Sequence, residues 1–154
     1  MRSICFRCFY FTRALCLATA NALIESTGIT KLEFVTCSFP AGECAAIMTN
    51  CLAKNTSLVS IKIDRPLDGT LIDALAAALP SNSTLRNLSF VAGTFSAVHL
   101  SRFFLALGTN TGLNALTVDV GKWANWDAVR AESLCKARKD GLELHTTLES
   151  LDVK

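Results

Sequence analysis

The sequence predicts an α/β fold in which a short strand and a helix alternate, with a parallel β-sheet on a concave side and helices on a convex side. Three observations support this. A triplet of apolar residues recurs at a nearly constant step, a polar turn precedes most copies, and the segments between copies have helical spacing. Such periodicity is typical of a solenoid, here of about four to five repeats.

The triplet is an apolar residue, two variable residues, an apolar residue, one variable residue and an apolar residue. It occurs five times, and the first positions of successive copies are 29, 27, 28 and 35 residues apart. A leucine stands six residues before each copy. The copies are Ile29-Leu32-Phe34, Leu58-Ile61-Ile63, Leu85-Leu88-Phe90, Leu113-Leu116-Val118 and Leu148-Leu151-Val153.

Each element can be assigned in order from these signals. Residues 13–24 are expected to form the first helix, and each triplet a strand. Later helices follow from apolar residues at i, i+3, i+4, i+7 spacing, and a helix between two strands makes those strands parallel. The residues with this spacing are Cys44, Ile47, Met48, Cys51 and Leu52; then Leu71, Leu75 and Leu79; then Leu100, Phe103, Phe104 and Leu107.

The last step is longer and predicts an extended helix or an inserted loop around Trp123 to Trp126, with the final helix starting near Asp127. That helix carries Arg138 where the others carry an apolar residue, so its packing is expected to differ. Between the other helices and strands lie the turns Asn55-Thr56-Ser57, Asn82-Ser83-Thr84 and Asn110-Thr111-Gly112, whose residue types end helices.

The pattern resembles the leucine-rich-repeat family, and in particular its ribonuclease-inhibitor-like class. The first copy follows the order L-x-x-L-x-L-x-x-N/C-x-L with Ile29, Leu32, Phe34, Cys37 and Phe39. The resemblance covers residues 13–154 and implies a right-handed horseshoe segment that binds a protein or peptide. Later copies have Pro66, Gly93 and Gly121 where the family has Asn or Cys, so the side-chain ladder after those strands is expected to be largely missing.

The expected binding surface is the concave face of the sheet. Side chains alternate between the two faces of a strand, so the residues between the buried triplet positions point toward this face. The surface is small, polar and of mixed charge. Its residues are Lys31, Glu33, Val35, Ser60, Lys62, Asp64, Asn87, Ser89, Val91, Ala115, Thr117, Asp119, Ser150 and Asp152.

Trp123 and Trp126 are the only tryptophans. They are candidates for an exposed anchor of the partner, or alternatively for a cap on the core.

The formal net charge is +2, from 15 basic and 13 acidic residues, which offers no broad field for a nucleic acid. No apolar run is long enough for a membrane span.

Seven cysteines, an odd number without secreted-scaffold spacing, are interpreted mainly as buried free thiols. Cys44 and Cys51 are expected as neighbours on one helical face. Cys5 and Cys8 form a CxxC motif, but no second pair stands at zinc spacing. We expect no metal site and no cofactor.

No catalytic motif is present: the sequence has no G-x-S-x-G, phosphate-binding loop or dinucleotide fingerprint. His99, in a helix, and His145, in a turn, have no ligand partners at suitable spacing. The prediction is a non-enzymatic, cytoplasmic interaction scaffold.

Because neither end carries a polar capping repeat and the chain is expected to begin inside a helix, self-association is expected unless residues 1–12 form a cap.

Two alternatives remain open. Residues 1–20 end in Ala18-Thr19-Ala20, similar to a signal-peptidase site, and sequons begin at Asn55, Asn82 and Asn87, so the chain is alternatively a secreted or surface recognition domain. The other alternative is a fragment of a regulatory leucine-rich-repeat protein, of the GTPase-regulator or immune-receptor type. No nucleotide-binding motif supports a GTPase activity in the chain itself.

Overall fold

The computed structural model describes residues 2–40, 42–93, 96–119, 139 and 147–153. In this part of the chain, strands and helices alternate as the triplets and the helical spacing predict. The elements are β1 (Arg2–Arg7), α1 (Arg13–Glu25), β2 (Ile29–Val35), α2 (Glu43–Lys54), β3 (Ser60–Leu67), α3 (Gly69–Ala78) with a 3₁₀ turn (Leu79–Ser81), β4 (Asn87–Ala92), α4 (Ala97–Thr109), β5 (Ala115–Asp119) and β6 (Ser150–Val153).

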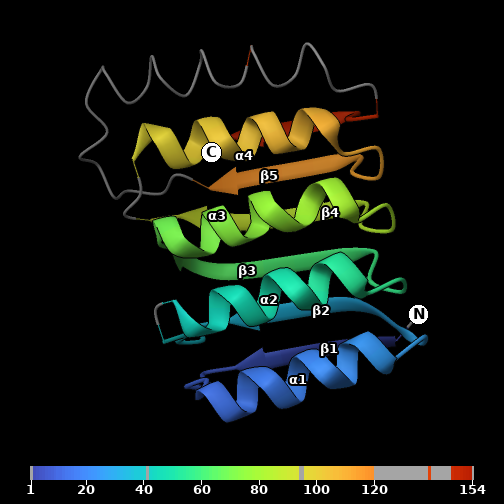
Figure 1. Cartoon of the computed structure of the whole chain (residues 1–154), viewed down its shortest axis with the longest axis vertical. Coiled ribbons are helices and arrows are strands. Elements are labelled where there is room, and N and C mark those ends of the chain that lie inside the picture. Colours follow the sequence, from blue (N-terminus) through green and yellow to red (C-terminus); the bar gives the residue numbers. More distant parts are fainter. Residues whose placement is uncertain (1, 41, 94–95, 120–138, 140–146, 154) are drawn as a thin grey trace.

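The strands form one six-stranded sheet in sequence order, and every neighbouring pair is parallel. Helices α1 to α4 lie side by side over the same face of this sheet (Figure 1). The five expected strands are confirmed. The final helix expected from Asp127, with Leu134, Cys135 and Arg138, lies outside the described residues.

Strand β1 was not expected from the sequence. Ile4 and Phe6 of β1 align with Leu32 and Phe34 of β2, so residues 2–7 add a strand to the first repeat. The expectation that the chain begins inside a helix is therefore wrong. Thr12 then begins α1 as its N-cap, because its hydroxyl accepts a hydrogen bond from the Leu15 amide at 3.2 Å.

The core lies between the sheet and the helices. The second and third triplet positions of β2 to β5 are buried, as is the leucine before each described turn. Each such fully buried aliphatic or aromatic side chain contributes roughly 1.5–3 kcal/mol of transfer free energy. The buried leucines are Leu23, Leu52, Leu79 and Leu107, and the strand residues are Leu32, Phe34, Ile61, Ile63, Leu88, Phe90, Leu116 and Val118.

Three buried asparagines join successive repeats at the turns before the strands. In Asn82, Oδ1 accepts hydrogen bonds from the amides of Thr84 (3.1 Å) and Leu85 (2.8 Å). Its Nδ2 donates to the carbonyls of Leu52 (2.6 Å) and Asn55 (3.3 Å) in the preceding repeat. Asn110 makes equivalent bonds, with its Nδ2 donating to the carbonyls of Leu79 and Asn82. Asn55 closes its own turn in the same way and donates to the Leu23 carbonyl, while the Ser57 hydroxyl donates to the Ser26 carbonyl. Buried side chains therefore form a ladder between neighbouring repeats, in the turns before the strands. The ladder position of the leucine-rich-repeat family, by contrast, follows the strand.

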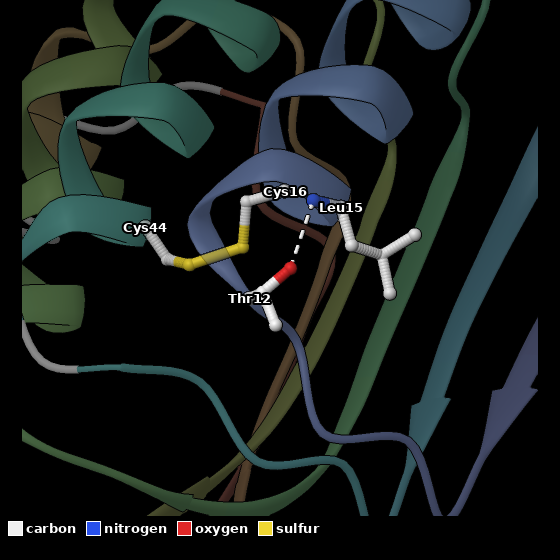
Figure 2. The surroundings of a disulfide bond; sticks show 4 residues. All are labelled: Thr12, Leu15, Cys16 and Cys44. Atoms are coloured by element: carbon white, nitrogen blue, oxygen red, sulfur yellow. Dashed lines mark hydrogen bonds between the residues drawn. A yellow bond between two sulfur atoms is a disulfide. The ribbon is translucent and has the colours of Figure 1, made fainter.

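The interpretation of the cysteines as free thiols is wrong for Cys16 and Cys44, which form a disulfide bond between α1 and α2 (Figure 2). They are 28 residues apart, about one repeat, and so occupy similar positions in successive helices. Both are buried. Adjacent helices in a solenoid pack side by side, and this places the Cα atoms of Cys16 and Cys44 6.0 Å apart.

The other described cysteines are free. Cys37 and Cys51 are buried, as expected, and burial raises the pKa of the Cys51 thiol to about 11, so it stays protonated at neutral pH. Cys5 and Cys8, the CxxC pair, are exposed rather than buried. In the described part of the chain, no three His, Cys, Asp or Glu side chains are grouped to hold a metal ion.

Candidate functional site

The face of the sheet that α1 to α4 leave uncovered, here called the open face, carries every described residue that the sequence placed on the concave surface. These side chains are exposed or partly exposed, whereas their neighbours along β2 to β5 are buried against the helices. The strand alternation is therefore confirmed. Trp123 and Trp126, the candidate anchors, lie outside the described residues.

Strand register arranges the open face in rows that run across the sheet. The first row contains Ser3, Lys31, Ser60, Asn87, Ala115 and Ser150. The second contains Cys5, Glu33, Lys62, Ser89, Thr117 and Asp152. In the third, Arg7, Val35 and Asp64 are in register, and after a register shift between Ile63 and Pro66 the row continues with Val91 and Asp119.

Ser3, Cys5 and Arg7 were missed by sequence reasoning because β1 itself was missed. A signal was available in the sequence. Ile4 and Phe6 alternate with more polar residues, as strand residues do, and together with Met1 they have the spacing of the triplet, 28 residues before Ile29. Arg7 is the most important addition, because it brings a positive charge to a surface expected to carry few basic groups.

Glu33 is surrounded by basic groups on the open face. Lys31 Nζ lies 2.8 Å from Glu33 Oε1, since residues i and i+2 of a strand share a face. The hydrogen bond from Lys31 is the main cause that lowers the pKa of Glu33. The Lys31 and Lys62 charges and a hydrogen bond from Cys5 act in the same direction, against the effect of burial. Glu33 is therefore ionised at neutral pH, and it neutralises one of the nearby lysines.

A hollow of about 180 Å³ lies on the open face over β3, β4 and β5. Lys62 and Asp64 line it from β3, Ser89 and Val91 from β4, and Thr117 and Asp119 from β5. This volume is smaller than the roughly 300–1,000 Å³ of ligand pockets, and it is suited to one side chain. Hydroxyls, carboxylates and an ammonium group around an apolar residue can orient a polar or charged side chain of a partner.

His99 belongs to the opposite side of the molecule. It lies in α4, and its Nδ1 is 3.1 Å from Asp73 Oδ1 in α3, while Arg102 binds the other carboxylate oxygen at 3.2 Å. Gly69 leaves room for the imidazole, because a Cβ at this position would overlap with His99 Nε2. This group joins two helices and has no contact with the open face. His145 lies outside the described residues.

Neither the models of known protein families nor the curated proteins include one that matches this chain. A solved structure, the leiomodin-1 actin-binding site 2, is similar in fold, with a TM-score of 0.62 and 20% sequence identity. The similarity covers 86% of this chain and 75% of that chain. It supports the repeating α/β architecture. None of the described helices is long and apolar enough to cross a membrane.

Proposed function

We propose that the chain is a non-enzymatic scaffold that binds a protein or peptide partner through the open face. The observation that carries this proposal is the continuous polar surface of six parallel strands, with a hollow of side-chain size at its centre. We further propose a ribonuclease-inhibitor-like leucine-rich-repeat solenoid of right-handed curvature, with about four to five repeats in residues 13–154 and with β1 as an additional strand before them.

Two further points support a protein partner. The similar leiomodin-1 structure is an actin-binding site, so this architecture is used in that protein to hold another protein. The open face also mixes both charges with hydroxyl groups, which suits hydrogen bonds and ion pairs to a peptide chain. We propose that this function needs no cofactor. The Cys16–Cys44 disulfide favours an oxidising compartment, as in the secreted alternative, over the cytoplasm that the sequence predicts.

Site-specific photo-crosslinking tests the proposal. A photoreactive amino acid replaces Ser89 on the open face in one sample and Leu105, an exposed residue of α4, in another. The Ser89 sample is expected to crosslink a defined protein from the cells of origin, and the Leu105 sample is not. Purified partner should then bind Lys62→Glu at least 10-fold more weakly than the chain with Lys54→Glu, an equal charge change on α2. Equal crosslinking from both positions would disprove the assignment of the open face.

A further inference from the structure

We propose that a cavity at the carboxyl ends of β2, β3 and β4 binds a free, apolar α-amino acid. This cavity is separate from the open face, and its lining residues take no part in the proposed function. Three features of the lining identify the ligand: a rigid apolar wall, a guanidinium group and a carboxylate that is not paired with it.

The cavity has the size of a small-molecule site. Its volume is about 450 Å³, within the range of roughly 300–1,000 Å³ that is typical of ligand pockets. It lies where the chain leaves β3 and enters α3, beside the loops that follow β2 and β4. Open α/β sheets bind their ligands on this side, outside the carboxyl ends of parallel strands.

The backbone shapes the cavity. The pairing of β3 with β4 is interrupted after Ile63, so Asp64 and Arg65 have no partner residue in β4. Such an irregularity bends a strand and re-aims its side chains. Gly93 lets the chain after β4 pass close to the end of β3, since a Cβ at this position would overlap with the Leu67 carbonyl oxygen. The cavity wall at the end of β3 therefore depends on backbone geometry as well as on side chains.

The apolar wall is held in place by the core. Phe39 stacks on the buried Phe11 with 5.0 Å between ring centroids, and it meets Phe34 edge-on at 5.2 Å. A ring supported in this way loses little entropy when a ligand packs against it. The other apolar lining residues are Pro66, Leu67 and Leu71. Such a wall favours a ligand with a branched or aromatic side chain.

Arg65 supplies the positive charge. Its Nη1 donates to the Cys37 carbonyl at 2.9 Å and also to the Ser38 hydroxyl, which fixes the guanidinium group. No described residue accepts a hydrogen bond from its Nε or Nη2, and Arg65 belongs to none of the ion pairs in the described part of the chain. A planar guanidinium with free donors binds a carboxylate well.

Asp68 supplies the negative charge. Its Oδ1 accepts a hydrogen bond from the Leu71 amide at 2.9 Å and so caps α3. Among the described residues, Oδ2 has no hydrogen-bond donor and the carboxylate has no ion-pair partner. Oδ2 can therefore accept a hydrogen bond from an ammonium group of a ligand.

The two unpaired charges select against simpler ligands. A carboxylic acid without an amine would face the Asp68 carboxylate, and an amine without a carboxylate would face Arg65. A free α-amino acid carries both charges and its apolar side chain on one carbon, whereas a residue inside a peptide chain carries neither charge. Phenylalanine is the probe of choice, because its ring can pack against Phe39.

Titration of L-phenylalanine into the full chain, followed by backbone NMR, tests this site. We expect saturable shifts of the amides of Leu67, Leu71 and Gly93 at millimolar ligand. Phenylpropionate, which lacks the amine, and phenethylamine, which lacks the carboxylate, should each bind more weakly by about 10-fold or more.

Two substitutions separate the roles of the two charges. Arg65→Met should weaken phenylalanine binding by about 10-fold or more and change phenethylamine binding by less than about 2-fold. Asp68→Asn should weaken phenylalanine binding equally and change phenylpropionate binding by less than about 2-fold. Asparagine is as good an N-cap as aspartate, so α3 keeps its start. Lys54→Met, which removes a positive charge from the last turn of α2, is the control and should leave phenylalanine binding unchanged.

The absence of saturable binding, equally tight binding of either single-charge analogue, or unchanged binding by Arg65→Met would each overturn the proposal. Shifts centred on Ser89 and Thr117 would place the ligand on the open face and would overturn it as well. None of the substitutions alters the open face, so such a failure would leave the proposed scaffold function intact.

Discussion

At the scale of single residues, the asparagines of the turns are suited to their position by the chemistry of the amide group. An amide has an acceptor oxygen and a two-hydrogen donor, so one side chain closes its own turn and holds the preceding repeat. Ser26 occupies the corresponding turn of the first repeat. Its hydroxyl accepts a hydrogen bond from the Ile29 amide at 3.3 Å and so closes the turn. Serine lacks the side-chain NH₂ group with which the asparagines hold the preceding repeat.

Asn82→Ala is expected to lower the free energy of unfolding by about 3 kcal/mol, because it leaves buried backbone amides and carbonyls without partners. Chemical denaturation followed by circular dichroism measures this loss. Asn87→Ala is the matched control, since Asn87 is exposed on the open face, and it should change stability by less than about 0.5 kcal/mol. A similar, small effect of both substitutions would show that the ladder contributes little.

The same hydrogen bonds bear on the sequons. An N-linked sugar is attached to Nδ2, but Nδ2 of Asn55 and Asn82 donates to buried carbonyls. These side chains are 3% and 5% exposed, so the folded structure has no room for a sugar on either. Asn87 is exposed and is the one sequon that the described fold leaves accessible.

At the scale of elements, the strands and helices with strong periodicity could be predicted from the sequence. Leu58, Ile61 and Ile63 are representative: their spacing predicts a buried strand, and β3 has it. Strand β1 was missed although Met1, Ile4 and Phe6 have the spacing of the triplet, because the apolar residues 1–20 also resemble a signal sequence. The open-face residues followed from strand alternation, and the register of β2 to β6 followed from the aligned triplets. The hollow could not be predicted, because it also depends on side-chain positions and on the register shift between Ile63 and Pro66.

The disulfide was not predicted from the sequence. Its two cysteines are 28 residues apart, which is one full repeat, and this separation was a usable signal. Its structural role is clear from its position. It fastens α1 to α2, and so attaches the terminal repeat, which has a described neighbour on one side only, to the rest of the molecule. Terminal repeats of solenoids are the first to unfold when the interface with their neighbour weakens.

Removal of this disulfide with the double substitution Cys16→Ala and Cys44→Ala should destabilise the terminal repeat by about 3 kcal/mol, from lost loop-closure entropy for a loop of this size. Hydrogen exchange should become faster in β1 and α1 and stay unchanged in β4 and α4. Reduction of the unsubstituted chain with a dithiol should reproduce the pattern. Uniform acceleration across all repeats would contradict a local role, and the double Cys37→Ala, Cys51→Ala variant serves as a control for loss of two buried sulfurs.

At the scale of the whole molecule, the terminal repeat constrains the interpretation of the first 20 residues as a signal. Cleavage after Ala20 would remove β1 and much of α1. It would also remove Cys16, the partner of Cys44, and Phe11, whose ring packs against Phe34 at 5.5 Å. The described fold therefore uses these residues as structure. A cleaved signal and the Cys16–Cys44 disulfide exclude each other.

The fragment 21–154 is accordingly expected to aggregate, while the full chain is expected to remain dispersed. Without β1 and Phe11, the apolar face of β2 around Leu32 and Phe34 loses part of its cover, and exposed apolar area of this kind drives association. Light scattering and circular dichroism on both chains at equal concentration measure the difference. A monomeric, fully folded 21–154 would contradict the structural role of the first repeat, and it would favour the secreted form that begins at Asn21.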